Sequence, residues 1–158
     1  MTRNVYLASR LREVLLNGHW VANTNFTEQV QKIGLKEAKQ RFSNLNTVAD
    51  LLFHINYYLG GLIRAFENGN LDIRDKYSFD LDPLTSEEEW NLLKQDFLHN
   101  AAAFANLVEQ MEDSKFDEAF INEKYGTVLR NIEGVIEHSY YHLGQIVLIQ
   151  KMNAIYAL

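Results

Sequence analysis

The sequence predicts an all-α protein, a bundle of four long helices in up-and-down or crossover order. Apolar residues recur in alternating steps of three and four over long stretches, as on one face of a helix. The 158 residues include one proline and eight glycines, too few for many short strands joined by turns. A hydrophobic fraction of 47% suits one domain with a substantial core, which we expect over residues 1–158.

The first helix is predicted from Thr2 to Leu16, because Asn17-Gly18 is a typical helix C-terminus. Its apolar residues at helical spacing are Leu7, Leu11, Val14 and Leu15. The segment from residue 20 to residue 42 is less regular. A short helix over residues 28–42 is indicated there, although Gly34 interrupts its pattern.

The second helix has a sharper start, because Thr47-Val48-Ala49-Asp50 matches a capping box. It is expected to end at Asn68-Gly69-Asn70. Its apolar arc comprises Val48, Leu51, Leu52, Ile55, Leu59, Leu62 and Phe66. Residues 71–84 are acidic and aromatic and contain the only proline, so they are predicted to form a surface connection.

The third helix is predicted to begin near Thr85 or Ser86, before three glutamates that complement the positive end of a helix dipole. Its apolar stripe is the most regular in the chain and comprises Trp90, Leu93, Phe97, Ala101, Phe104, Val108 and Met111. Residues 113–126 are predicted to be a connection. The fourth helix is expected from about Thr127 to Met152, with its buried side formed by Val128, Ile132, Val135, Ile136, Leu143, Ile146 and Val147.

Composition excludes several functional classes. The net charge is −6 without a basic run, so binding to nucleic acid, which depends on clustered Lys and Arg, is not expected. The absence of cysteine excludes disulfides, thiolate metal sites and a cysteine nucleophile, and is compatible with a reducing compartment. We find no candidate membrane span and no export signal, and therefore expect a cytoplasmic protein.

Three of the five histidines lie at the edges of predicted apolar arcs. His138 and His142 are one helical turn apart and project from the same side of the fourth helix. His54 occupies a similar position on the second helix. Buried imidazoles that meet without partners are costly, and a divalent cation such as zinc, nickel, copper or iron would unite them. Three nitrogen ligands with open coordination positions are typical of a catalytic more than of a structural site.

The alternative is that these histidines are ordinary half-buried side chains, which is the interpretation we give to His19 and His99. Neighbouring residues carry similar alternatives. Gln145 is predicted either to bond a metal ligand or a metal-bound water, or to be a half-exposed polar residue. Tyr58 and Tyr141 either line a pocket or place a polar tip at the edge of the bundle.

Two further residues near the histidines have local interpretations. Asp50 lies one turn before His54 and could orient that ring, but the capping box already accounts for it. Gly144 is unfavourable in a helix interior by about 1 kcal/mol relative to alanine, so we expect it to admit a close neighbouring helix.

The sequence resembles the DinB/YfiT-like superfamily of metal-binding four-helix bundles. The residues that carry the resemblance are Val48 to Ile55 around His54, and the run Glu137 to Ile146, with its His-x-x-x-His-x-Gly-Gln pattern. The order and spacing of the helices fit along the chain, except over residues 71–83. The resemblance implies a crossover connection, a homodimer, and a nickel, zinc or iron ion held by His54, His138 and His142.

Two functional hypotheses follow. Characterised members of the superfamily include S-transferases that use a low-molecular-weight thiol, so the resemblance implies a metal-dependent enzyme that activates a thiol or water for a small-molecule substrate. A metal-dependent hydrolase, in which the metal activates water, is the second form of the enzyme hypothesis. The other hypothesis is a non-catalytic protein that binds the metal or is stabilised by it. A bundle without a metal is a third, weaker reading.

Overall fold

The computed structural model describes residues 1–156 and is mostly helical. The helices are α1 (Arg3–Arg12), α2 (Phe26–Gln31), α3 (Leu35–Ala38), α4 (Val48–Asn68), α5 (Glu87–Glu109) and α6 (Val128–Tyr156). A π-helical turn, Glu13–Asn17, continues α1, and the 3-10 turns are Asp75–Tyr77, Asp113–Asp117 and Glu123–Tyr125. No strand occurs within residues 1–156, which confirms the predicted all-α class.

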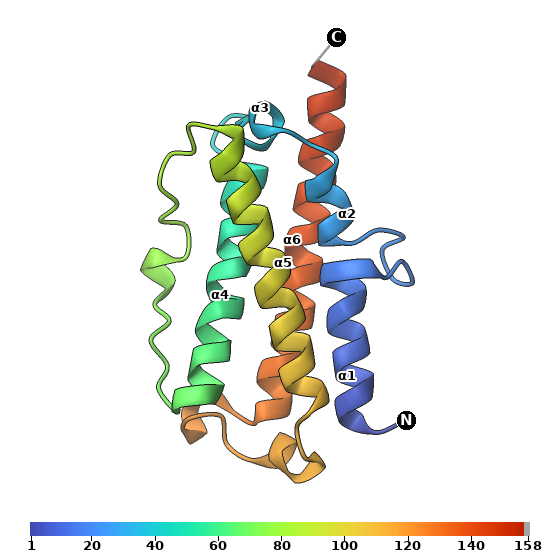
Figure 1. The fold of residues 1–158 in the computed structure, drawn as a ribbon, viewed down its shortest axis with the longest axis vertical. Coiled ribbons are helices and arrows are strands. Elements are labelled where there is room, and N and C mark those ends of the chain that lie inside the picture. Colours follow the sequence, from blue (N-terminus) through green and yellow to red (C-terminus); the bar gives the residue numbers. More distant parts are fainter. Residues whose placement is uncertain (157–158) are drawn as a thin grey trace.

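The helices α1, α4, α5 and α6 lie side by side along the longest axis of the molecule (Figure 1). In this view α1 and α6 run upward, whereas α4 and α5 run downward. α5 packs against both α4 and α1, and α6 also contacts both of them. Because α4 and α5 point in the same direction, the segment between them, residues 69–86, returns along the full length of α4 (Figure 1).

The core is formed by the predicted apolar faces. In α5 the side chains of Trp90, Phe97 and Phe104 are completely buried, as the regular stripe predicted. Trp90 also donates its indole N–H to the carbonyl oxygen of Ile33 over 3.1 Å, which ties the α2–α3 segment to α5. Met111 is the exception in α5, because it lies beyond the end of the helix and is only partly buried. On the other predicted faces, Phe66, Val135 and Val147 are likewise only partly buried.

Local capping signals place the starts of α4 and α5 correctly. The Thr47 hydroxyl accepts from the Asp50 backbone N–H at 3.1 Å, and the Asp50 carboxylate accepts from the Thr47 N–H at 2.8 Å. The capping-box interpretation of Asp50 is therefore confirmed. The same carboxylate also forms an ion pair with Arg41. Ser86 forms the equivalent box on α5. Gly69 ends α4 in the left-handed conformation, at φ 72°.

Three predictions of local structure need correction. The helix expected over residues 28–42 is two short helices, α2 and α3, and Gly34 is the N-cap of the second. α6 continues to Tyr156, four residues beyond the predicted end. A close neighbouring helix at Gly144 was the wrong expectation, because a Cβ atom built there meets no heavy atom within 4 Å.

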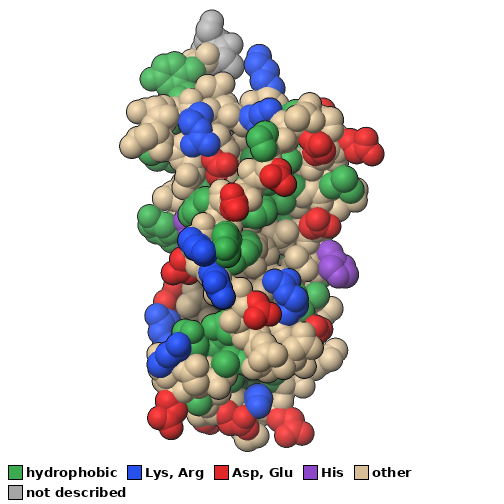
Figure 2. Space-filling view, turned by 90° about the vertical axis from the view of Figure 1, so that its left-hand side faces the viewer, with side chains coloured by type: hydrophobic (Ala, Val, Ile, Leu, Met, Phe, Trp, Pro, Cys, Tyr) green, Lys and Arg blue, Asp and Glu red, His purple; other side chains and the backbone are tan. Residues whose placement is uncertain are grey.

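Two properties of the surface bear on function. Within residues 1–156, no helix combines the length and the apolar character needed to cross a membrane. Figure 2 shows the face on which the 69–86 connection lies. Acidic and basic side chains are interspersed there with hydrophobic ones, without a continuous field of one sign.

Candidate metal centre

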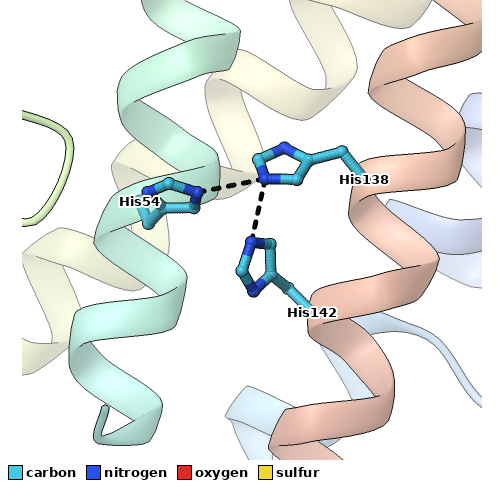
Figure 3. Close-up of side chains that lie close together, drawn as sticks. All are labelled: His54, His138 and His142. Carbon is cyan, nitrogen blue, oxygen red and sulfur yellow. Dashed lines mark hydrogen bonds between the residues drawn. The ribbon is translucent and has the colours of Figure 1, made fainter. Parts of the chain in front are cut away.

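The imidazoles of His54, His138 and His142 converge between α4 and α6 (Figure 3). Nε2 of His138 lies 3.1 Å from Nε2 of His54 and 2.8 Å from Nε2 of His142. One potential ligand nitrogen from each residue lies within 4.8 Å of the other two. His54 and His142 are buried, and His138 is half-buried. The three histidines singled out from the sequence are therefore brought together by the fold.

The helices explain this convergence. His138 and His142 are four residues apart on α6, so their side chains lie one above the other on the same face. His54 extends from α4, which packs against α6. The pair is set by the spacing along one helix, whereas the third ring is added by the packing of two helices.

Hydrogen bonds on the far side of two rings set their tautomers. Nδ1 of His54 donates to the carbonyl oxygen of Ser78 at 3.2 Å, and Nδ1 of His142 donates to the side-chain oxygen of Gln145 at 2.6 Å. Carbonyl oxygens only accept, so the proton of each neutral ring lies on Nδ1. Both Nε2 atoms are then left with lone pairs that point toward His138. A single proton on Nε2 of His138 can satisfy only one of them.

The electrostatic environment keeps the rings neutral. Burial, followed by the charge of the neighbouring imidazoles, lowers the pKa of His138 from 6.5 to about 4. Burial and the charge of His142 lower the pKa of His54 to about 4 as well. The pKa of His142 is also lowered, mainly by burial. At neutral pH the cluster therefore offers uncharged nitrogen donors, the form in which histidine binds metal ions.

The donor set fits a divalent metal ion. Metal–nitrogen bonds of about 2.0–2.1 Å at tetrahedral or octahedral angles place neighbouring ligand nitrogens about 2.8–3.4 Å apart. The spacings of 2.8 and 3.1 Å around His138 lie within that range. In the part of the chain that the structure describes, neither a carboxylate nor a cysteine joins the group. The three histidines can thus hold a metal ion and leave positions for exogenous ligands.

The other predicted site residues surround this cluster. Gln145 is half-buried and bonds His142, as described above. The Tyr58 ring meets His54 and His138 edge-on, with centroid distances of 5.0 and 5.5 Å. Tyr141 lies edge-on to His142 at 4.8 Å but is 63% exposed, so it borders the cluster from outside.

The 69–86 connection contributes residues that sequence analysis missed. Phe79 stacks on the His54 ring at 4.0 Å, with an angle of 13° between the planes, and the buried Ser78 supplies the carbonyl bonded to Nδ1. Asp75 accepts a hydrogen bond of 2.8 Å from the Tyr58 hydroxyl. Burial and this bond raise the pKa of Tyr58 to about 12, so the hydroxyl stays protonated. The connection lies at the surface, as predicted, and it also forms a wall of the site, which no helical periodicity signals.

The remaining histidines lie elsewhere. His19 is exposed and pairs with Glu28 at 3.0 Å, and His99 is exposed on α5. Both lie outside the cluster, as expected from the sequence, but they are exposed and not half-buried as predicted.

A cleft of about 510 Å³ adjoins the cluster at His138 and Tyr58. α4, α6 and the connections before α5 and before α6 form its walls. The apolar side chains that line it are Leu62, Leu71, Ile73, Phe120 and Val135. A small molecule in this cleft would lie directly beside a candidate metal ligand.

No family model, no curated protein and no solved structure matches the chain. The fold and the site define an all-α protein with a three-histidine group that can hold a metal ion. Inference about its function therefore depends on the chain's own residues.

Proposed function

We propose that this chain is a divalent-metal-binding four-helix bundle of the DinB/YfiT-like type, with nickel, zinc or iron held by His54, His138 and His142. The convergence of three Nε2 atoms, two of them on rings whose Nδ1 protons are already committed, is the observation that carries the proposal. The parallel course of α4 and α5, joined by a connection along the length of α4, supports the crossover form of the bundle.

We further propose that the protein is an enzyme of the thiol-dependent S-transferase type, acting on a small molecule with a low-molecular-weight thiol as co-substrate. A bound divalent cation lowers the pKa of a thiol or water and so supplies a nucleophile at neutral pH. The cleft beside His138 supports this proposal, because it gives a small molecule access to the edge of the cluster. Metal-dependent hydrolysis, with water in place of the thiol, uses the same arrangement.

The residues around the cluster would orient the ligands and limit solvent. The carbonyl of Ser78 and the amide of Gln145 hold two rings in the tautomer that presents Nε2. Phe79 covers one face of His54, and the Tyr58 ring separates His54 and His138 from part of the solvent. Partners of this kind orient metal-binding histidines and raise their basicity.

The alternative is a non-catalytic metal-binding or metal-stabilised protein. The bond between His54 and Ser78 favours it, because a ligand ring directly joins α4 to the 69–86 connection. Under this alternative, metal binding would order the connection without turnover. A large fall in melting temperature on chelation, with no reaction on any electrophile, would support it.

Metal analysis of protein purified without a polyhistidine tag tests the binding proposal. The expected result is about one divalent ion per chain in the wild type and in His99→Ala, and loss of the ion in His138→Ala. His99 is a matched control because it is an exposed helix histidine outside the cluster. Equal metal content in His138→Ala and His99→Ala would contradict the site.

Turnover tests the enzymatic proposal separately. The metal-loaded protein is assayed with generic alkyl and aryl halides and several low-molecular-weight thiols, and with ester substrates for hydrolysis. We expect one of these reactions to proceed in the wild type and in His99→Ala but not in His138→Ala. Metal binding without any such difference would leave the non-catalytic alternative.

We also propose that the protein is a homodimer. Three exposed apolar residues of α6, namely Tyr141, Leu148 and Ile155, recur every seven residues and so share one face of the helix. Pairing of this face between two copies would cover it. Light scattering of the wild type and of Leu148→Glu tests the proposal, with a dimer expected for the first and a monomer for the second.

A further inference from the structure

The cleft beside His138 is lined by apolar side chains together with a few polar ones. Leu62 and Phe120 are buried in its walls, and Leu71, Ile73 and Val135 are partly buried. A volume of about 510 Å³ lies within the range of small-molecule sites, which are mostly apolar with a few placed polar groups. The shape and composition therefore suit an organic molecule with a hydrophobic portion.

Gly134 keeps the cleft open. It lies on α6 one turn before His138 and lines the cleft, and a Cβ atom built there meets no heavy atom within 4 Å. Packing against the protein therefore does not require a glycine at this position. Its φ is not positive, so the backbone does not require one either. A Cβ atom at residue 134 would thus stand in open space at the wall of the cleft.

Arg74 is the cation that lines the cleft. Its backbone N–H and carbonyl are both bonded to the hydroxyl of Tyr57, at 2.9 and 3.1 Å, which fixes the main chain at this point. Its guanidinium forms no hydrogen bond or ion pair with residues 1–156. The neighbouring Asp75 carboxylate accepts from the Tyr58 hydroxyl. Arg74 is thus available to an anionic group, whereas one oxygen of the adjacent acid is engaged by Tyr58.

We infer that the substrate of the proposed metal site is a small organic anion whose apolar body lies over Gly134 and whose anionic group pairs with Arg74. This inference rests on the proposed function for its placement beside the metal ligands. It makes Gly134 and Arg74 specificity-determining residues. Neither residue is a metal ligand in the arrangement described above.

Binding of a probe to the metal-free protein tests the inference. The probe is 4-phenylbutanoate, and its neutral amide has nearly the same size and shape. Shifts of backbone amide signals around residues 119–135 are followed by NMR during titration. We expect saturable binding of the carboxylate with an affinity on the order of millimolar, as is usual for a probe of this size. The amide should bind about two- to fivefold more weakly, because Arg74 is exposed.

Variants separate the two determinants. Gly134→Leu adds a branched side chain at the wall of the cleft and should strongly weaken binding of both probes, and Gly134→Ala should weaken it by less. Leucine and alanine favour a helix more than glycine does, so the fold is expected to remain. Gln95→Leu, which adds a leucine to an exposed position of α5, is the control and should bind like the wild type. Arg74→Gln should lower carboxylate binding to the level of the amide.

Each outcome bears on the inference. Unchanged binding in Gly134→Leu, or no saturable binding of the carboxylate by the wild type, would overturn the placement in the cleft. Equal affinities for the carboxylate and the amide would overturn the role of Arg74. Because these titrations require neither metal nor turnover, they can fail while His138→Ala still loses its ion. Conversely, the cleft can bind the probe even where the metal proposal fails.

Discussion

Nδ1 of His142 lies 2.6 Å from the side-chain oxygen of Gln145, which is three residues further along α6. The two residues belong to one helix, so this bond is set by local spacing. The bond determines which nitrogen of His142 faces the other imidazoles. A substitution of Gln145 therefore alters the proposed metal site while all three ligands remain in place.

Substitution of Gln145 should weaken metal binding. Gln145→Ala removes the acceptor for Nδ1–H of His142, and partners of this kind typically contribute about 10- to 100-fold in metal affinity. Gln145→Glu keeps an acceptor at that position and should retain most of the affinity. Competition with a chromophoric chelator measures both constants. The same affinity for Gln145→Ala and wild type would show that this bond does not support the ligand.

Substitution of Phe79 should loosen the 69–86 connection over the site. The Phe79 ring stacks on His54 at 4.0 Å, and an aromatic pair of this kind contributes about 0.5–1.5 kcal/mol beyond burial. Phe79→Ala should therefore lower the free energy of unfolding by at least that amount and increase hydrogen exchange near Ser78. Tyr77→Ala is the control, since its exposed ring lies beside Lys76 and not beside His54. Equal exchange in the two variants would contradict a role for the stack.

The metal-free protein should lose stability in mild acid. Burial and neighbouring imidazoles lower the pKa of His54 and His138 from 6.5 to about 4 in the folded chain. Between these values the unfolded chain binds protons that the folded chain does not, so unfolding becomes easier as the pH falls. The contribution of His54 and His138 to the free energy of unfolding is fully present above pH 6.5 and is lost progressively toward pH 4. Denaturant titrations across this range measure the slope. The dependence of the free energy of unfolding on pH should be shallower in the variant with glutamine at residues 54, 138 and 142. An equal slope in the wild type and this variant would refute the attribution of the acid sensitivity to the three histidines.

The capping box of α4 should contribute to stability independently of the site. Thr47→Ala removes the hydroxyl that accepts from the Asp50 N–H, and loss of such a cap costs about 1 kcal/mol. Thr2→Ala is the control for an N-cap threonine without a capping bond, because Thr2 precedes α1 but its exposed side chain makes no such bond. Chemical denaturation should show a loss only for Thr47→Ala. Equal losses of stability in the two variants would mean that replacement of threonine by alanine, and not loss of the capping bond, lowers the free energy of unfolding.

Much of the fold could be predicted from the chain itself because the relevant signals are local. The stripe from Trp90 to Val108 has the period of a helix, so it identified α5 and its buried face. Thr47 and Ser86 marked helix starts through bonds that span three residues. Gly144 shows the limit of such signals, because a glycine in a helix can reflect close packing or open space, and only the neighbours distinguish the two.

The sequence by itself determined the helices and the His138–His142 pair, since both depend on residues within one turn of each other. Only the tertiary structure decided that His54 meets this pair, that Ser78 and Phe79 cover it, and that a cleft opens over Gly134. These relationships join residues from 24 to 84 positions apart, as in the bonds from His54 to Ser78 and to His138. Helical periodicity carries no information across such separations, so the packing of α4 on α6 and the return of the 69–86 connection had to supply it.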